Sequence, residues 1–294
     1  MTSGPSLGDR IERVGSLSPS QVDAELDRLE REVPTHPPLE RAGLSPCTKA
    51  RVFGDTHGDW SSLLWALDGA WDDPETLLIG LGDYVDRSPP DCPQGSAVAA
   101  LFLLELVAER PDRLLLLQGN HETVDVIPVH PRSFEEEVYA RWKGGPRRAA
   151  RLGALLRRGP LAACTDSGAY LAHAGFPRPP LPVPWTRALD APGADRTEEI
   201  TWADCEASSA RRGGLPPFGE EDLRRFLDAA GLSVFLRGHD PDLTGRVLWG
   251  NRLVTLHTTR VYARFGGIVA AEIPLDHPIH DLGSVRILRR PIPG

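Results

Sequence analysis

Apolar residues occur along the chain in short runs that alternate with stretches of helical spacing. Runs at 50–53, 77–81 and 114–117 each precede polar loops, and helical patterns follow at 59–70 and 94–110. Repeated strand–helix–strand units of this kind predict a mainly parallel sheet with both faces covered. The chain from residue 49 is therefore expected to be an α/β protein.

The second half of the chain contains shorter β patterns. Residues 177–194 are rich in proline and predict an irregular surface loop. Two apolar runs flank Gly250-Asn251, which predicts a hairpin on a two-residue turn. The further predicted strands are 161–165, 169–173, 233–236, 268–273 and 285–288.

Residues 1–48 are predicted to form an N-terminal arm with one helix. Ser18-Pro19-Ser20-Gln21 is a capping box with proline at the first helical position. Val22, Leu26 and Leu29 then share one helical face. We interpret this helix as packing on a single catalytic domain of residues 49–294, with partner binding as the alternative.

The composition is that of a soluble globular protein. The chain has 294 residues, of which 40% are hydrophobic and 25% charged, and a net charge of -8 gives no basic surface for nucleic acid. No cysteine lies in a C-x-x-C pair, so free thiols in a reducing compartment are expected. The longest apolar run, 97–108, contains Glu105 and is too short to span a bilayer, and the N-terminus lacks the apolar core of a signal peptide. We therefore expect a cytoplasmic protein without nucleic-acid or membrane partners.

Polar clusters beside glycines follow the predicted strands, at the edge where α/β sheets hold their ligands. Three oxygen donors and three imidazoles suit a pair of divalent ions from the manganese, iron and zinc range. Two ions about 3.5–4 Å apart would clamp a phosphoryl group for in-line attack, with a central carboxylate as their bridge. The six candidate ligands are Asp55, His57, Asp83, Asn120, His173 and His239.

In their order and spacing, the motifs resemble those of the phosphoprotein phosphatase (PPP) family of calcineurin-like metallophosphoesterases. The resemblance covers about residues 49–275 and implies a central β-sandwich of mixed sheets flanked by helices, a four-layer α/β/β/α fold. The three main segments are Asp55-Thr56-His57-Gly58, Gly82-Asp83-Tyr84-Val85-Asp86-Arg87 and Gly119-Asn120-His121-Glu122. Later segments agree: His173-Ala174-Gly175, Trp202-Ala203-Asp204, Arg212-Gly213, Arg237-Gly238-His239 and Tyr262.

The resemblance implies a role for each matched residue. The first ion would be held by Asp55, His57 and Asp83, and the second by Asp83, Asn120, His173 and His239. The phosphate would be bound by Arg87, Asn120, Arg212 and Tyr262. The predicted catalytic residues are His121, Asp86, Arg87 and Arg212. His121, paired with Asp86, would protonate the leaving oxygen, because an alkoxide leaves poorly and a carboxylate-held imidazolium is a positioned acid.

The resemblance also implies an activity. The expected reaction is hydrolysis of phosphoserine and phosphothreonine in phosphoprotein substrates, by direct attack of a water held by two divalent ions. Manganese is the expected ion in vitro, with iron or zinc as alternatives. The oligomeric state is not predicted.

The sequence departs from the family pattern around this core, as in prokaryote-type members. Ser88 stands for a glycine, Gln118 for an arginine, and residues 258–261 do not match the Ser-Ala-Pro-Asn that precedes the family's tyrosine. These departures leave the substrate open. Phosphotyrosine, a dinucleoside polyphosphate or another small phosphoester remain alternatives, as does a non-catalytic phosphoprotein-binding module.

Other polar residues receive structural interpretations. Asp59 is interpreted as a helix N-cap, with support of the metal site as the alternative. His257 lies on a predicted strand, so core packing is expected. Arg237 either orients His239 or pairs with a carboxylate, and the sequence leaves both open.

Overall fold

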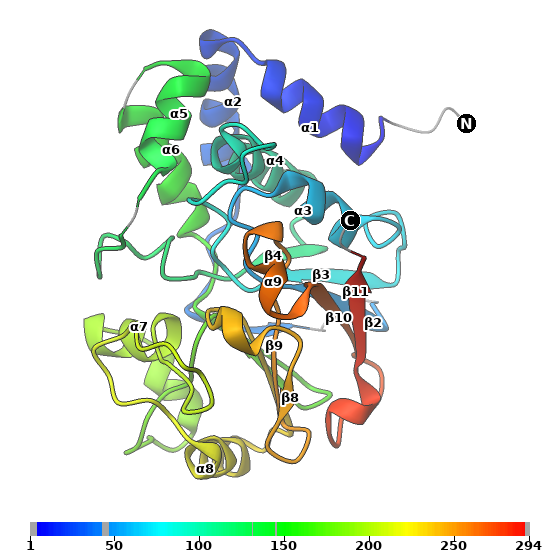
Figure 1. Ribbon diagram of the computed structural model, residues 1–294, viewed down its shortest axis with the longest axis vertical. Coiled ribbons are helices and arrows are strands. Elements are labelled where there is room, and N and C mark those ends of the chain that lie inside the picture. The colour runs from blue at the N-terminus through cyan, green and yellow to red at the C-terminus, as the bar shows by residue number, and fades with distance from the viewer. Residues whose placement is uncertain (1–4, 43–46, 131, 145, 292–294) are drawn as a thin grey trace.

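Two mixed β-sheets form the centre of the molecule (Figure 1). The structure is a computed structural model that describes residues 5–42, 47–130, 132–144 and 146–291. In the five-stranded sheet the order is β11 (Arg286–Arg290), β10 (Ile268–Pro274), β2 (Lys49–Phe53), β3 (Thr76–Gly80), β4 (Leu114–Leu116). In the six-stranded sheet it is β1 (Leu39–Ala42), β5 (Ala162–Thr165), β6 (Ala169–Ala172), β7 (Val234–Arg237), β9 (Leu253–Thr255), β8 (Val247–Leu248).

The central strands are apolar on both faces because both faces are covered. In β3, Leu78 joins the core beneath the outer helices, whereas Ile79 joins the core between the two sheets. In β7, Leu236 points between the sheets and Phe235 points to the opposite helices. Side chains that alternate along a strand thus build three stacked hydrophobic cores.

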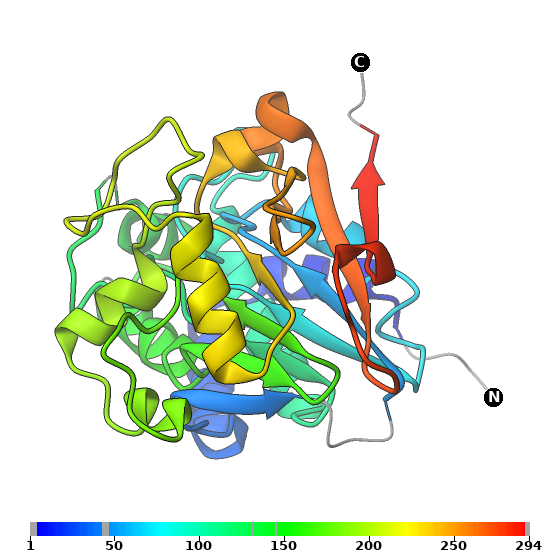
Figure 2. The same ribbon diagram turned by 90° about the horizontal axis from the view of Figure 1, so that it is seen from below.

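Helices cover the outer face of each sheet, which confirms the predicted four-layer α/β/β/α fold. Figure 2 shows α8 lying across the six-stranded sheet, seen from below. Helices on the five-stranded side are α1 (Leu7–Ser16), α2 (Pro19–Glu32), α3 (Trp60–Leu67), α4 (Gly95–Glu109), α5 (Phe134–Trp142) and α6 (Pro146–Leu156). On the other side are η1 (Trp185–Leu189), α7 (Ala194–Thr201) and α8 (Glu220–Ala230). Short helical turns complete the chain: η2 (Pro241–Leu243), η3 (Arg260–Tyr262), α9 (Ala263–Gly266) and η4 (Leu282–Ser284).

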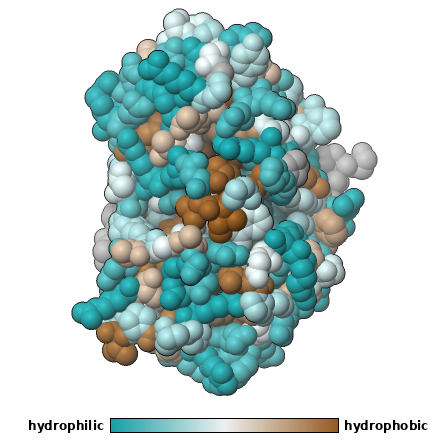
Figure 3. Space-filling model, turned by 90° about the vertical axis from the view of Figure 1, so that its left-hand side faces the viewer, coloured by the Kyte–Doolittle hydropathy of each residue, from teal (hydrophilic) through white to brown (hydrophobic). Residues whose placement is uncertain are grey.

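The outward faces of the helices are polar. The side of the molecule that carries α5, α6 and α7 is mostly hydrophilic, with small apolar spots near its middle and lower corner (Figure 3). Among the described residues, no helix is both long and apolar enough to cross a membrane.

The N-terminal segment contains more structure than predicted. The expected single helix is wrong, because α1 precedes α2 and β1 adds a strand parallel to β5. The helix α1 escapes a pattern search since it buries only Ile11 and Val14, although Ser6 caps it with a capping box. Residues 43–46, next to the predicted boundary at 48/49, lie outside the described residues, and the division into arm and catalytic domain stays a prediction.

Strand direction and one turn also differ from the expectations. The strand β10 lies antiparallel to β2, and β5 lies antiparallel to β6, so neither sheet is wholly parallel. The hairpin forms as predicted, but Leu248 pairs with Leu253, so four residues rather than two make its loop. Hydrophobic periodicity carries no information on strand direction, which explains the first difference.

Candidate active site

Loops that leave the ends of strands from both sheets meet at one place. The loop after β2 carries Asp55 and His57, the loop after β3 carries Asp83, and the loop after β4 carries Asn120 and His121. From the other sheet, β6 leads directly into His173, and β7 leads into His239. The structure therefore brings together all six residues predicted as ligands.

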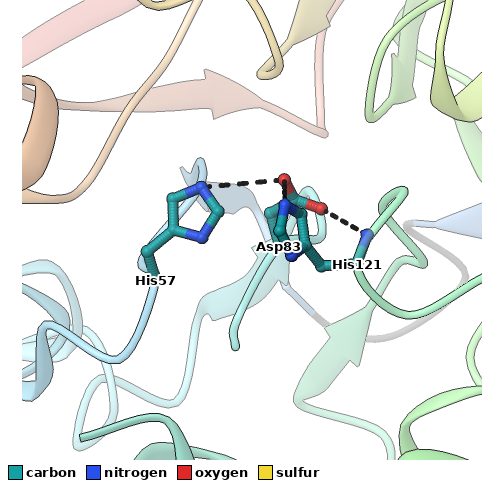
Figure 4. Close-up of side chains that lie close together, drawn as sticks. All are labelled: His57, Asp83 and His121. Carbon is teal, nitrogen blue, oxygen red and sulfur yellow. Dashed lines mark hydrogen bonds and ion pairs between the residues drawn. The ribbon is translucent and has the colours of Figure 1, made fainter. Parts of the chain in front are cut away.

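The carboxylate of Asp83 lies at the centre of this cluster. Its Oδ2 atom is 3.7 Å from Nε2 of His57, 3.8 Å from Nε2 of His121 and 3.5 Å from Nε2 of His173. Figure 4 shows the contacts of Asp83 with His57 and with His121 as dashed lines. Asp83 belongs to two groups of possible metal donors, one with His57 and the predicted acid His121, the other with Asp55 and His173. One carboxylate shared by two donor groups is the arrangement expected of a bridging ligand.

Backbone carbonyls fix the tautomers of two histidines. Nδ1 of His57 lies 2.9 Å from the carbonyl of Val85, and Nδ1 of His173 lies 3.1 Å from that of Leu81. Each Nδ1–H donates to a carbonyl, so each Nε2 presents a lone pair to the carboxylates. Burial also lowers the pKa of His57 to about 4, which keeps its ring neutral. A neutral imidazole with its lone pair directed inward is ready to bind a metal ion.

The contacts of Asn120 test whether cations fit here. Its Oδ1 atom lies 2.9 Å from Nε2 of His173 and 3.2 Å from Nδ1 of His239. With the proton of His173 on Nδ1, its Nε2 and the amide oxygen face each other as two acceptors. A cation between them turns this repulsion into shared coordination, and nitrogen with oxygen donors suits manganese, iron or zinc. The residues present therefore fit divalent ions.

The buried carboxylates remain ionised. Asp55 and Asp83 are almost fully buried, and burial alone would raise the pKa of each. Neighbouring histidines outweigh burial and hold the pKa of both carboxyls below the ordinary value. Two buried negative charges side by side need positive charge for compensation.

His121, a member of one donor group, forms a close pair with Asp86. Nδ1 of His121 lies 2.5 Å from Oδ2 of Asp86, and Oδ1 of Asp86 accepts from the backbone N–H groups of Ser133 and Phe134. Burial would lower the pKa of His121, but Asp83 and Asp86 outweigh it and raise the pKa. Its Nε2 atom has no hydrogen-bond partner in the described part of the chain. The pair therefore presents a proton on Nε2 toward the site.

The two predicted phosphate-binding arginines lie at different sides of the cluster. Nη1 of Arg87 donates to the hydroxyl of Tyr262 at 2.5 Å and lies 3.4 Å from Nε2 of His57. Nη1 of Arg212 donates to the carbonyl of His239 at 2.7 Å and to Asp240 at 2.9 Å. Both guanidinium groups are held beside predicted ligands, where they can bind phosphate oxygens.

The sequence pattern of the family described as "Calcineurin-like phosphoesterase" matches residues 48–243, more than half of the chain. The chain belongs to the calcineurin-like phosphoesterase family. It is 29% identical over 222 residues to a probable serine/threonine-protein phosphatase of Encephalitozoon cuniculi, covering 72% of this chain and 47% of the relative. It is 26% identical over 244 residues to the serine/threonine-protein phosphatase 4 catalytic subunit of Saccharomyces cerevisiae, covering 79% of this chain and 76% of the relative.

A solved structure of a protein serine/threonine phosphatase from Saccharomyces cerevisiae, with similarity to human phosphatase PP5, has the same fold. Its TM-score is 0.76 at 21% identity, and the match covers 95% of this chain and 92% of that chain. The family and fold expected from the motifs are thereby confirmed.

The backbone of this phosphoesterase is strained where the site residues lie. Five of its non-glycine residues with positive φ are predicted ligands or catalytic residues. They are His57 (φ 44°), Asp83 (φ 56°), Asp86 (φ 65°), Arg87 (φ 58°) and His239 (φ 71°). Residues other than glycine rarely adopt this left-handed backbone conformation, which costs about 1–3 kcal/mol per residue. Such strain is typical of functional sites.

The glycines beside the ligands let the loops approach them closely. A Cβ atom at Gly119 would clash with Oδ1 of Asp83, and one at Gly238 would clash with Oδ1 of Asp55. Both loops need glycine there.

The structure adds residues that the sequence did not assign to the site. Nε2 of His257, which was expected only to pack in the core, lies 3.2 Å from Oδ2 of Asp55. Asp204 accepts from the backbone of Arg212, and its other oxygen lies 3.7 Å from Nε2 of His239. His257 is the second residue after β9, as Asp55 is the second after β2. The strand-end argument, applied to β9, would have found it.

Asp59 and Arg237 both contact groups outside the donor cluster. Asp59 caps α3 through the backbone N–H of Ser62, as interpreted from the sequence. Arg237 forms an ion pair with Asp240 and donates to the carbonyl of Ala203, so pairing with a carboxylate is the alternative that the structure supports.

Proposed function

We propose that this phosphoesterase is a metal-dependent phosphoprotein phosphatase that hydrolyses phosphoserine and phosphothreonine without a covalent phosphoenzyme. The observation that carries the proposal is the His121–Asp86 pair next to Asp83, the carboxylate that two donor groups share. The names of the two relatives, both phosphatases, support the same substrate class.

In this proposal the side chains serve metal binding, phosphate binding or proton transfer. Asp55, His57, Asp83, Asn120, His173 and His239 hold two divalent ions, which when bound would neutralise phosphate charge and lower the pKa of a water molecule. Arg87 and Arg212 bind the phosphate oxygens and orient them for in-line attack. His121 gives the proton on Nε2 to the leaving oxygen of the serine or threonine side chain, and Asp86 stabilises the imidazolium.

Two finer points belong to the same proposal. We propose manganese as the ion that restores activity best in vitro, with iron and zinc as alternatives, because mixed nitrogen and oxygen donors suit all three. We also propose a cytoplasmic location, which the cysteine pattern of the sequence supports.

A substrate panel with metal add-back tests the proposal. The protein is stripped with a chelator, dialysed and assayed with manganese, zinc or ferrous iron. The panel contains phosphoserine, phosphothreonine and phosphotyrosine peptides and diadenosine tetraphosphate. We expect manganese-dependent turnover with the highest kcat/KM on the phosphoserine and phosphothreonine peptides.

Variants sharpen the result. Asp83→Ala should lose nearly all hydrolysis of every phosphoester, and His121→Ala should lose nearly all hydrolysis of the phosphoserine peptide. His277→Ala, on the exposed surface, serves as the matched control. A large preference for diadenosine tetraphosphate would overturn the substrate class. Absence of metal-dependent turnover of every phosphoester would overturn the assignment as an enzyme.

A further inference from the structure

The segment of residues 258–262 carries Tyr262 from the end of β9 into the site. The hydroxyl of Tyr262 accepts from Nη1 of Arg87 and lies 3.3 Å from Nε2 of His57. The ring of Tyr262 also stands edge-on against the rings of His57 and His257. The direction of the Arg87 guanidinium thus depends on where this segment places the tyrosine.

Arg260 anchors the segment to the start of α3. Its Nε and Nη2 atoms lie 3.0 Å and 2.8 Å from the two carboxylate oxygens of Asp59, and its backbone N–H donates to the same carboxylate at 2.7 Å. Nη1 adds an ion pair with Asp91, and Nη2 lies 3.1 Å from Sγ of Cys92. A planar guanidinium that contacts one carboxylate with two nitrogens fixes orientation as well as distance.

The partner of Arg260 is itself immobilised. Asp59 is fully buried and accepts from the backbone N–H of Ser62 at 3.1 Å and from its hydroxyl at 2.7 Å. The arginine side chain is 24% exposed, so only part of the ion pair is screened by water. The contacts of Arg260 thus link residues 258–262 to the N-terminus of α3 and to the loop around Asp91.

These contacts of Arg260 lie where the sequence departs from the family pattern. Arg260 stands at the position of the proline in the Ser-Ala-Pro-Asn that the segment does not match. A proline stiffens a segment by fixing its own φ. Residues 258–262 contain no proline, and contacts between Arg260 and the buried carboxylate of Asp59, 201 positions away in sequence, provide the stiffness.

We propose that Arg260 is a positioning residue for phosphate binding that acts through Tyr262. By holding its segment on Asp59, it keeps the tyrosine hydroxyl against Arg87 and so keeps the Arg87 guanidinium directed at the bound phosphate. The inference rests on the proposed function only in taking Arg87 as a phosphate ligand. It holds for any phosphoester substrate.

A double-mutant cycle between Arg260 and Tyr262 tests the inference. The four proteins are wild type, Arg260→Met, Tyr262→Phe and the double variant; methionine keeps much of the apolar stem, and phenylalanine keeps the ring. The readouts are the Kd of inorganic phosphate by calorimetry on manganese-loaded protein, and kcat and KM for a phosphomonoester.

We expect Arg260→Met to weaken phosphate binding roughly three- to thirtyfold when Tyr262 is present. This range corresponds to the interaction energies typical of residues whose contacts depend on each other. In the Tyr262→Phe background the same change should alter Kd less than about twofold, because the contact to Arg87 is already lost. Arg260→Lys keeps the charge but not the paired geometry, and should recover part of the affinity. Arg224→Met, which breaks exposed ion pairs on α8, is the matched control and should bind phosphate like the wild type.

The outcomes separate the two proposals. Equal weakening in both backgrounds, or no weakening at all, would overturn the role of Arg260, and so would failure of the wild type to bind phosphate. If wild type binds phosphate and the cycle is non-additive, but no phosphopeptide is hydrolysed, the positioning role stands and the proposed function fails. Thermal unfolding of each variant shows whether it is folded, and Arg260→Lys provides the comparison if Arg260→Met is not.

Discussion

Replacing Asp86 by asparagine removes one charge and leaves the shape of the side chain almost unchanged. The substitution therefore isolates what the carboxylate 2.5 Å from Nδ1 of His121 contributes. The backbone N–H groups of Ser133 and Phe134, at 2.6 Å and 2.7 Å from Oδ1, still find an acceptor in the amide oxygen. We expect the variant to fold and to lose the acid function of His121.

The size of the effect follows from burial and charge. Asp86 is 1% exposed and His121 is 3% exposed, so the hydrogen bond between them is shielded from water. A hydrogen bond to a charged group contributes about 1.5–3 kcal/mol. At about 1.4 kcal/mol for each factor of ten, the loss is a roughly ten- to hundredfold drop in kcat on a phosphoserine peptide. The pKa of His121 should also fall, so the alkaline limb of the pH–rate profile should move to lower pH.

The assay compares two leaving groups. A serine alkoxide needs a proton as it leaves, whereas the phenolate of an activated aryl phosphate does not. Asp86→Asn should therefore lose at least about ten times more activity on the phosphoserine peptide than on the aryl phosphate. Equal losses on both substrates would refute the assignment of Asp86 and His121 as the acid, because a general distortion of the site would affect both alike.

Three further predictions concern stability. Manganese added to chelator-treated protein should raise the Tm, and Asp83→Asn should abolish that shift in a thermal-unfolding series, since the ions bind only the folded state. Burial raises the pKa of Glu105 to about 6 despite its ion pair with Arg13. The folded state therefore binds this proton more tightly than the unfolded chain, stability falls as pH rises from about 4.5 to 6, and Glu105→Gln should flatten that slope in urea unfolding. Trp142 is fully buried, so Trp142→Ala should reduce the free energy of unfolding by about 3–5 kcal/mol, and a loss below about 1 kcal/mol would contradict its place in the core.

The sequence predicts the donor cluster well because its members lie next to apolar runs. Asp55, Asp83 and Asn120 each follow a buried strand within a few residues, and parallel strands bring such positions to one edge. The layered fold follows from the same runs, since strands that are apolar on both faces need cover on both sides. These features depend on local pattern, which a single sequence contains.

The contacts that the sequence misses join residues far apart along the chain. Arg260 and Asp59 are 201 positions apart, and no spacing rule links an irregular segment to a helix cap. The same holds for Ser88, which differs from the family's glycine and whose hydroxyl donates to Glu137 on α5. Both departures from the family pattern thus have partners elsewhere in this chain, and only the folded structure identifies them.

The all-round burial of α4 has a consequence for how the chain folds. Its residues from Gly95 to Val107 are all buried, and Ile11, Val14 and Leu26 of the N-terminal helices belong to the same core. Because α1 and α2 precede α4 in the chain, they have no such surface to pack on until α4 has been synthesised, and such long-range contacts form slowly. Without α1 and α2, the helix α4 would expose the apolar side chains that pack against them, so a chain shortened to residues 49–294 should aggregate rather than fold.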